Sequence, residues 1–350
     1  MSITNLEPEM FKSPNLRAFK AALIVVSAAL SAGLAQATVL QLAPINSLTT
    51  TIYNGFQVQS LNLNNQCSSA GDPRCLPSGS YPVKSGPGQI YDQAIILSGV
   101  VNPQVNNTPN PFPNGSSVDN PFETPNGNTG SSFVMSNTNE PANSFTGDKV
   151  GSWEVKITDL LTYLKGHDLV FLFDNNQEGN AVNQALSVWG QVSITNAAGV
   201  SQECIQLSLG ARSDCSSVPP PLATYVPAVG AYCVNKVTGA SYALGAAKSS
   251  ACSAGDYYVN DNLSTSQAEF AIFNSYLNRN LQSWADENFF LSVDVRYVGN
   301  NAGSEQLWIC SECTIARISD LPPNGVPEPG SLALLGLGML GLLAVRRRKH

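Results

Sequence analysis

The sequence predicts a mostly β body, folded as a sandwich or jelly roll with one or two short helices, between an N-terminal signal peptide and a C-terminal transmembrane helix. Of the 350 residues only 12% are charged and 43% are hydrophobic, while Asn, Ser, Thr, Gly and Pro supply much of the remainder. This composition suits a β-rich domain with many loops. Alternating apolar and polar runs, which indicate strands, also outnumber the helical patterns.

Residues 1–37 have the three parts of a secretory signal peptide. Three basic residues form the positive region: Lys12, Arg17 and Lys20. An apolar segment follows at 21–34, and Ala35-Gln36-Ala37 has the small-x-small form that signal peptidase accepts. We therefore expect export through the Sec translocon and cleavage after Ala37. A retained anchor is the alternative, but the short apolar run and the cleavage site argue against it.

Residues 38–325 form the body, which is acidic. It contains 11 Lys or Arg residues and 22 Asp or Glu residues, so its net charge is −11. Nucleic acid is itself strongly negative, and we therefore exclude it as a partner. The remaining basic residues lie at the two ends of the chain, where they serve targeting.

All eight cysteines lie in the body, which indicates disulfides formed in an oxidising compartment. Proximity in the sequence suggests four couples: Cys67 with Cys75, Cys204 with Cys215, Cys233 with Cys252, and Cys310 with Cys313. Eight cysteines allow about 105 connectivities, so this pairing rests on proximity alone. Zinc is the alternative for the last couple. It needs further ligands, and His167 is the only histidine of the body.

The first half of the body combines strands with long polar segments. Residues 39–63 alternate apolar and polar side chains, which predicts strands with one buried face. The apolar run at 91–101 is typical of a buried strand. Residues 102–147 are rich in Asn, Pro, Gly, Ser and Thr, so we predict a long surface loop there.

The most regular patterns begin at Gly151. Residues 153–157 predict a strand, 158–164 a short helix that ends at Gly166, and 168–173 a buried strand. Strict alternation over 185–195 then puts five residues on one face of a strand: Leu186, Val188, Gly190, Val192 and Ile194.

Three further elements complete the body. Residues 264–284 are the best helix candidate, because apolar residues recur there every three or four positions. Residues 289–298 alternate strictly and predict a strand. A last strand is expected over 306–318, with two of the cysteines in it.

The polar run that follows the buried strand is the main candidate for ligand binding. Its Asp174, Asn176 and Glu178 could supply hard oxygen ligands to Ca²⁺ or hydrogen-bond a sugar. The alternative is a plain turn, since Asn, Asp and Gly suit any chain reversal after a strand. Asp119 and Glu123 in the long loop are a second set of oxygen ligands, without EF-hand spacing. No other cofactor is expected.

The sequence has no signature of an enzyme. A serine or cysteine triad needs a histidine base, and His167 precedes a strand in a turn context. The body has no G-x-S-x-G, HExxH, Walker or G-x-G-x-x-G motif. Paired carboxylates, which a glycosidase uses, remain as the alternative, with Asp286 beside Glu287 and Asp159 with Asp174 as candidates. We therefore expect a non-enzymatic protein.

The last 25 residues form a separate signal. The motif Pro327-Glu328-Pro329 precedes an uncharged apolar stretch, 331–345, which predicts a short transmembrane helix. Four basic residues close it: Arg346, Arg347, Arg348 and Lys349. By the positive-inside rule this tail stays in the cytoplasm. The two prolines keep the motif extended, as a protease groove requires.

In motif, spacing, helix and basic tail, residues 326–350 resemble the PEP-CTERM sorting domain. The resemblance implies a substrate of exosortase, a membrane protease of Gram-negative bacteria that usually make exopolysaccharide. The enzyme would recognise Pro327, Glu328 and Pro329 outside the inner membrane, cut near them, and release or transfer the body. These three are therefore substrate residues, and the helix is a transient anchor. A permanent tail anchor is the alternative.

Together these features predict a surface or extracellular-matrix protein with a structural or adhesive role linked to exopolysaccharide. The alternative is a secreted carbohydrate-active enzyme that uses two carboxylates. A third interpretation, an ice-binding protein, would need flat arrays of regularly spaced threonines, and Thr49-Thr50-Thr51 alone is not one.

Overall fold

The computed structural model describes much of the body. The described residues are 39–45, 47–75, 83, 85, 94–99, 106, 112, 117–126, 131–135, 149–177, 184, 186–210, 215, 220–228, 231–243, 252–260 and 267–316. The predicted cleavage-site residues Ala35 and Ala37 lie outside them, as do the motif Pro327-Glu328-Pro329, the segment 331–345 and the basic tail 346–349. In the part of the chain that is described, no helix combines the length and the apolar character needed to cross a membrane.

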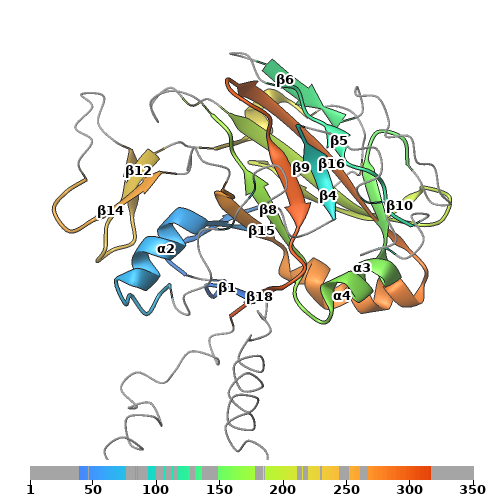
Figure 1. The fold of residues 1–350 in the computed structure, drawn as a ribbon, viewed down its shortest axis with the longest axis horizontal. Coiled ribbons are helices and arrows are strands. Elements are labelled where there is room, and N and C mark those ends of the chain that lie inside the picture. The colour runs from blue at the N-terminus through green and yellow to red at the C-terminus, as the bar shows by residue number, and fades with distance from the viewer. Residues whose placement is uncertain are drawn as a thin grey trace, which may run out of the picture. The chain divides into compact units, whose positions relative to one another are not determined.

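Strands dominate the described residues, as predicted, and form several sheets (Figure 1). The largest sheet has seven strands in the order β2-β3-β15-β8-β17-β4-β5. Their bounds are β2 Thr50–Tyr53, β3 Phe56–Ser60, β15 Phe270–Phe273, β8 Val170–Asp174, β17 Gln306–Ile309, β4 Ile95–Ser98 and β5 Phe122–Glu123. Neighbours in this sheet are antiparallel except β4 and β5.

A second sheet has six strands. Its path is β10-β9-β16-β6, with β11 beside β9 and β7 beside β16. The bounds are β10 Ser201–Leu207, β9 Ser187–Thr195, β16 Phe290–Asn300, β6 Ser131–Val134, β11 Val226–Pro227 and β7 Trp153–Lys156. The predicted strands at 185–195 and 289–298 are thus observed as β9 and β16. Strands β5 and β6 fall within 102–147, where the sequence predicts a loop, because each carries a buried phenylalanine, Phe122 or Phe133.

Two smaller sheets and three helices complete the described fold. One small sheet has the order β13-β12-β14, and in the other β1 pairs with β18 in parallel. The bounds are β12 Ala231–Val234, β13 Ser241–Ala243, β14 Tyr257–Asn260, β1 Leu40–Leu42 and β18 Cys313–Ile315. The helices are α2 Leu61–Ser69, α3 Ile157–Leu164 and α4 Ser275–Asp286, with a 3-10 turn η3 at Leu222–Thr224. The described residues therefore contain three short helices where the sequence predicts one or two.

Helix α2 is the one that the sequence does not predict. The alternating pattern of 39–63 extends through Leu61 and Leu63, but the Ser60 hydroxyl accepts a hydrogen bond from the backbone N–H of Leu63 and begins a helix there. Such a capping hydrogen bond stabilises a helix start by about 1 kcal/mol. Upstream, Asn54 and Gly55 both have positive φ and form the two-residue turn of the β2–β3 hairpin.

The predicted helix at 264–284 is wrong in its first half. Residues Phe270–Phe273 form strand β15, which pairs with β3 on one side and β8 on the other. Its apolar side chains satisfy either pattern, and hydrogen bonding to two neighbouring strands decides between them. The Asn274 side chain then accepts from the N–H groups of Tyr276 and Leu277, so α4 begins only at Ser275. The strand predicted at 306–318 is likewise divided into β17 and β18, because Cys310 and Cys313 are joined across a turn.

The two larger sheets contribute to one hydrophobic core. Phe171, Phe173 and Leu307 come from the seven-stranded sheet, and Val192, Val293 and Val295 from the six-stranded one. Helices α3 and α4 lie side by side at the edge of this core, where the Tyr163 hydroxyl donates to the Ile309 carbonyl (Figure 1). The opposite face of the seven-stranded sheet is also buried, against β1, β18 and the start of α2. This explains why every residue of β8 is buried.

The structure joins the eight cysteines in the four couples suggested by proximity. The bridges are Cys67–Cys75, Cys204–Cys215, Cys233–Cys252 and Cys310–Cys313. The partners are 8, 11, 19 and 3 residues apart in the sequence. Each bridge is therefore local, and none of them ties one large sheet to the other.

Removing the Cys233–Cys252 bridge should destabilise the protein more than removing the Cys310–Cys313 bridge. The first closes a 19-residue separation and the second only a 3-residue one, so the first restricts the unfolded chain more. We expect the double variant Cys233→Ser/Cys252→Ser to lose about 3 kcal/mol of unfolding free energy in urea. Peptide mapping without reductant should recover all four couples, and free thiols at most of the cysteines would contradict this pairing.

Candidate functional site

An apolar cavity with a volume of about 470 Å³ lies between the two larger sheets. On one side it is lined by side chains of β3, β8 and β15: Val58, Phe171, Phe173, Phe270 and Ile272. On the other side it is lined by residues of β9, β10 and β16: Val188, Gly190, Val192, Leu207, Val293 and Val295. Cavities of this size and character are typical of sites for small molecules.

The alternation of the strands produces this lining. On β9, the predicted face carries Val188, Gly190 and Val192 to the cavity, because successive residues of a strand point to opposite sides of the sheet. On β16 the same rule sends Val293 and Val295 inward and turns their charged neighbours to the other side. None of the described residues that line the cavity is Asp, Glu, Lys, Arg or His.

One end of the cavity is formed by the β12–β13 hairpin together with residues 48–51. Polar groups gather at this end, and the exposed ones among the lining residues are Thr51, Ser241 and Tyr242. In Figure 1 this hairpin region lies beside α2 and away from α3 and α4. The cavity therefore meets solvent at a polar rim and is apolar between the sheets.

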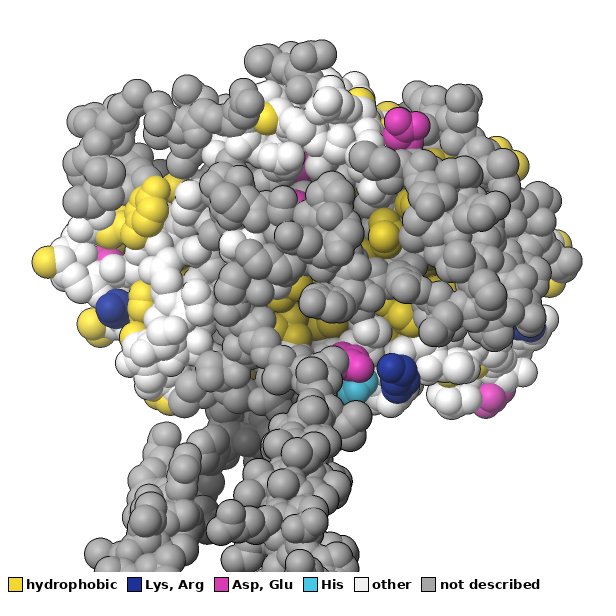
Figure 2. Space-filling view, in the orientation of Figure 1, with side chains coloured by type: hydrophobic (Ala, Val, Ile, Leu, Met, Phe, Trp, Pro, Cys, Tyr) yellow, Lys and Arg dark blue, Asp and Glu magenta, His cyan; other side chains and the backbone are white. Residues whose placement is uncertain are grey.

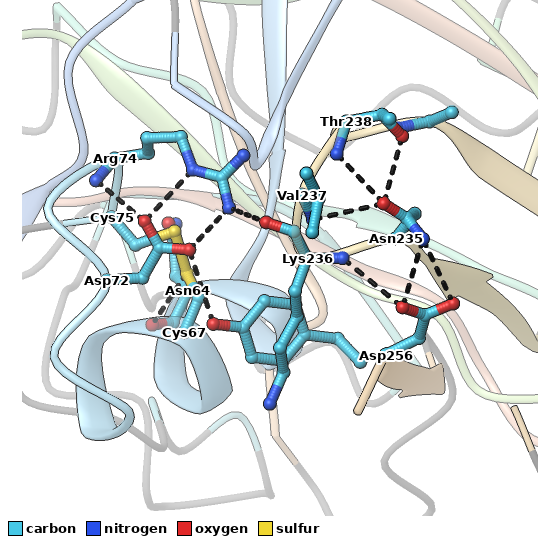
Figure 3. Close-up of polar contacts among 12 residues, drawn as sticks. Asn64, Cys67, Asp72, Arg74, Cys75, Asn235, Lys236, Val237, Thr238 and Asp256 are labelled. Atoms are coloured by element: carbon cyan, nitrogen blue, oxygen red, sulfur yellow. Dashed lines mark hydrogen bonds and ion pairs between the residues drawn. A yellow bond between two sulfur atoms is a disulfide. The ribbon is translucent and has the colours of Figure 1, made fainter. Parts of the chain in front are cut away.

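Polar contacts hold the hairpin in place (Figure 3). The Asn235 side-chain carbonyl accepts from the backbone N–H groups of Val237 and Thr238 and so closes the turn. The Asp256 carboxylate accepts from the Asn235 amide and from the Tyr242 hydroxyl. These contacts fix the turn and one of the rim side chains.

A second set of contacts ties the hairpin to the loop after α2. The Arg74 guanidinium donates to the Lys236 carbonyl and forms an ion pair with Asp72, whose pKa it lowers (Figure 3). The Lys236 ammonium lies 4.4 Å from the centre of the Tyr257 ring. Because two of the four disulfides also close these segments, this end of the cavity is built before any ligand arrives.

The polar run after β8 is the candidate for Ca²⁺ binding in the sequence. In the structure, its first residues form hydrogen bonds with other parts of the protein. The Glu269 and Glu305 carboxylates accept from the backbone N–H groups of Asn175 and Asn176, at 2.7 and 2.8 Å. Ser85 donates its hydroxyl to Asp174. The chain reversal at the end of β8 is thus held by two carboxylates from distant segments.

Burial changes the acidity of this cluster. It raises the pKa of Asp174 to about 6 and that of Glu305 well above its ordinary value. Asn176 lies in the cluster, while Glu178 lies outside the described residues. Among the residues that are described, no group of three or more His, Cys, Asp or Glu side chains is arranged to hold a metal ion. The role of Glu269 and Glu305 in this turn is not predictable from the sequence, because no local pattern distinguishes them from other acidic residues.

A second buried carboxyl lies on the far side of β16 from the cavity. Glu154 is fully buried and accepts from the hydroxyls of Ser152 and Ser292 and from the N–H of Lys149. Burial raises its pKa to about 7. The Asp119 carboxylate accepts from the backbone N–H of Glu154. Asp119, a candidate cation ligand in the sequence, therefore holds strand β7 in place.

The other predicted candidates lie apart from both the cavity and the buried carboxyls. Asp286 and Glu287 are exposed at the end of α4, and Asp159 is in the first turn of α3. Asp174, which the sequence paired with Asp159, instead hydrogen-bonds Glu269. His167 contacts the Thr314 hydroxyl at 3.1 Å. Among the described side chains on the face seen in Figure 2, charged ones are few, and hydrophobic ones show in its hollows.

Comparison with known families decides where the chain belongs. A family model described as a domain of unknown function, DUF8239, matches residues 40–296. The chain belongs to the DUF8239 family. A second model, the PEP-CTERM protein-sorting motif, matches residues 325–349. No curated protein and no solved structure matches the chain.

The two matches divide the chain between body and sorting signal. The DUF8239 match begins at β1 and ends within β16, so it includes most strands that line the cavity. The PEP-CTERM motif includes Pro327, Glu328 and Pro329 and confirms the resemblance drawn from the sequence. This DUF8239 protein is therefore an exported protein that exosortase processes and that is sent to the cell surface.

Stability of this DUF8239 body should fall as the pH rises from about 4.5 to about 7. The folded protein binds a proton at Glu154 up to a pKa of about 7, whereas the ordinary value is 4.5. In that window the folded state holds more protons than the unfolded state, so each rise in pH favours unfolding. The variant Glu154→Gln stays neutral and should lose part of this decline.

Urea unfolding of both proteins at several pH values in the window measures the effect. Asp174 and Glu305 contribute in the same direction and remain in the variant, so the decline should become smaller and not vanish. Glu287→Gln, on the surface, is the control for the loss of one carboxyl. Equal pH dependence of Glu154→Gln and the unchanged protein would contradict the role of burial.

Proposed function

We propose that this chain is a non-enzymatic surface protein with a structural or adhesive role in an exopolysaccharide matrix. The PEP-CTERM motif carries the proposal, because it implies exosortase, whose hosts usually make exopolysaccharide. In this proposal the Sec translocon exports the chain, signal peptidase removes residues 1–37, and residues 331–345 anchor the body in the inner membrane until exosortase cuts. The host is a Gram-negative bacterium.

The buried carboxyls favour a binding role over catalysis. A glycosidase needs two carboxyl groups on either side of a bond in an open site. Glu269 and Glu305 are at most 1% exposed and each accepts a hydrogen bond from the protein's own backbone. Glu154 is equally buried. Their arrangement stabilises turns and strands, and these three described carboxyls do not face an open site.

The architecture suits a rigid module outside the cell. Two larger sheets that share one core support the sandwich arrangement that the composition predicts. Four local disulfides stabilise the loops and the hairpin, and they persist outside the cell, away from the cytosolic reductants that would break them. The body combines rigidity with an uncharged cavity, which suits a structural or adhesive protein.

Replacing Pro327, Glu328 and Pro329 together by alanine should leave the uncut chain in the inner membrane. Exosortase would no longer find its motif, while export through the N-terminal signal is unaffected. Fractionation and immunoblotting of the native host measure the result. The double variant Pro322→Ala/Pro323→Ala removes two nearby prolines outside the motif and should be processed as usual. Normal processing of the first variant would refute recognition by exosortase.

Exopolysaccharide from the same host should bind the protein without being cut. Co-sedimentation with the purified polysaccharide measures binding, and release of reducing ends measures hydrolysis. We expect binding and no product. Product formation that is abolished by Glu269→Gln or Asp174→Asn, in variants that keep the circular dichroism of the unchanged protein, would overturn the non-enzymatic role and establish a carbohydrate-active enzyme.

A further inference from the structure

The cavity between the two larger sheets is too apolar to be filled by ordered water. A buried water needs two to four polar partners, and the strands on both sides present mainly Val, Leu, Ile and Phe side chains. An empty apolar cavity lowers stability by an amount that grows with its volume. A volume of about 470 Å³ is therefore best explained as room for an apolar molecule.

The exposure of the lining side chains supports this view. On β15, Phe270 and Ile272 point between the two sheets and remain partly accessible. Their neighbours Ala271 and Phe273 point to the other face of the sheet and are fully buried. The face that should be packed against the second sheet is thus the more accessible of the two. At this place side chains do not fill the space between the two sheets.

Gly190 supplies an independent observation. It lies in the middle of β9 and faces the cavity between Val188 and Val192, and its φ is not in the left-handed region. A Cβ atom built on it would meet Leu207 Cβ at 3.7 Å and the Asp294 carbonyl oxygen at 4.0 Å, which are ordinary contacts. Neither the backbone nor crowding therefore requires glycine. A glycine inside a strand weakens it and often marks a bulge, a tight bend, or the close approach of a ligand or another backbone. The β9–β16 register runs unbroken through Gly190, so a bulge is not the reason, and the cavity in front of it leaves room for a ligand.

The lining also defines the chemistry of the ligand. No described lining residue is cationic or anionic, so a charged group would lie in the cavity without a partner. Hydroxyl groups gather at the rim, from Thr51, Ser241 and Tyr242. The Tyr242 hydroxyl already donates to Asp256 and accepts from the backbone N–H of Ser253. The hydroxyls of Thr51 and Ser241 are therefore the ones that can hydrogen-bond an uncharged polar end, such as an alcohol or an ester. The part of the ligand between the sheets must be hydrocarbon.

We infer that the cavity binds one uncharged aliphatic chain, with its polar end at the Thr51–Ser241–Tyr242 rim and its hydrocarbon beside Gly190. This site is additional to the matrix role and does not depend on it. The hairpin contacts of Arg74 and Asn235 hold the rim in advance, which lowers the entropy cost of binding.

The test uses the full chain in lipid nanodiscs and a 1-dodecanol that carries a photoreactive diazirine. After illumination, mass spectrometry of peptides locates the label. We expect labelled residues on β8, β9 and β15, and we expect excess unlabelled 1-dodecanol to suppress this labelling. Dodecanoate should compete at least about ten-fold less well, because no cationic side chain lines the cavity.

Two variants at Gly190 make the test specific. Gly190→Leu fills the cavity and should remove labelling of the three strands, while Gly190→Ala, whose methyl group has room, should weaken labelling several-fold with unchanged circular dichroism. Val200→Leu, on an exposed turn, is the matched control and should label like the unchanged chain. If Gly190→Leu fails to fold, the labelling of Gly190→Ala relative to that of Val200→Leu tests the inference.

Three results would overturn the inference. The first is labelling of the strands that excess 1-dodecanol leaves unchanged, or labelling confined to residues outside the cavity. The second is labelling of the folded Gly190 variants equal to that of Val200→Leu. The third is competition by dodecanoate as strong as that by 1-dodecanol, which would contradict the uncharged character of the ligand.

Discussion

The pairing of β9 with β16 is the interaction on which the body depends. The two strands are joined from Thr195 opposite Phe290 to Ser187 opposite Val298. This register sends Val293 and Val295 to the cavity and turns the intervening residues, Asp294 among them, to the other side. A slip by one residue would exchange the two faces and place charge in the cavity. The β9–β16 register therefore sets both the core and the uncharged lining.

The far side of β16 shows how that charge is accommodated. Arg296 is fully buried, yet it forms an ion pair of 2.7 Å with Asp294 and lies 5.1 Å from the Trp189 ring. Ser292, on the same side, donates to Glu154. A buried charge is tolerated only when it is paired and hydrogen-bonded. This side of the sheet is consequently a polar network, and none of the described residues on the cavity side is Asp, Glu, Lys, Arg or His.

Disulfides and apolar burial have separate tasks in this protein. Each of the four bridges joins residues at most 19 positions apart, so the bridges stabilise a helix end, a hairpin, a corner and a loop. The two large sheets are held together by the core that they share. The cavity lies in that core, beside residues that are packed. A ligand there would complete the contact between the sheets, so binding and stability are linked.

The sequence by itself determined the features that depend on neighbours along the chain. The sorting motif and the alternation of 185–195 and 289–298 each depend on a few consecutive residues. Proximity along the chain suggested the four cysteine couples, and the structure established them. The alternation also assigned Val188, Gly190 and Val192 to one face. The mostly β class followed from composition and from the number of such patterns.

Tertiary structure decided what depends on partners far away in the sequence. Residues 270–273 suit a helix or a strand, and pairing with β3 and β8 made them a strand. The sequence suggested Asp174 as a cation ligand. In the structure, Glu269 and Glu305, from distant segments, accept hydrogen bonds from the backbone N–H groups of the turn that follows Asp174. The cavity could not be predicted from the sequence for the same reason. It is a property of the distance between two sheets, and no local pattern of side chains encodes that distance.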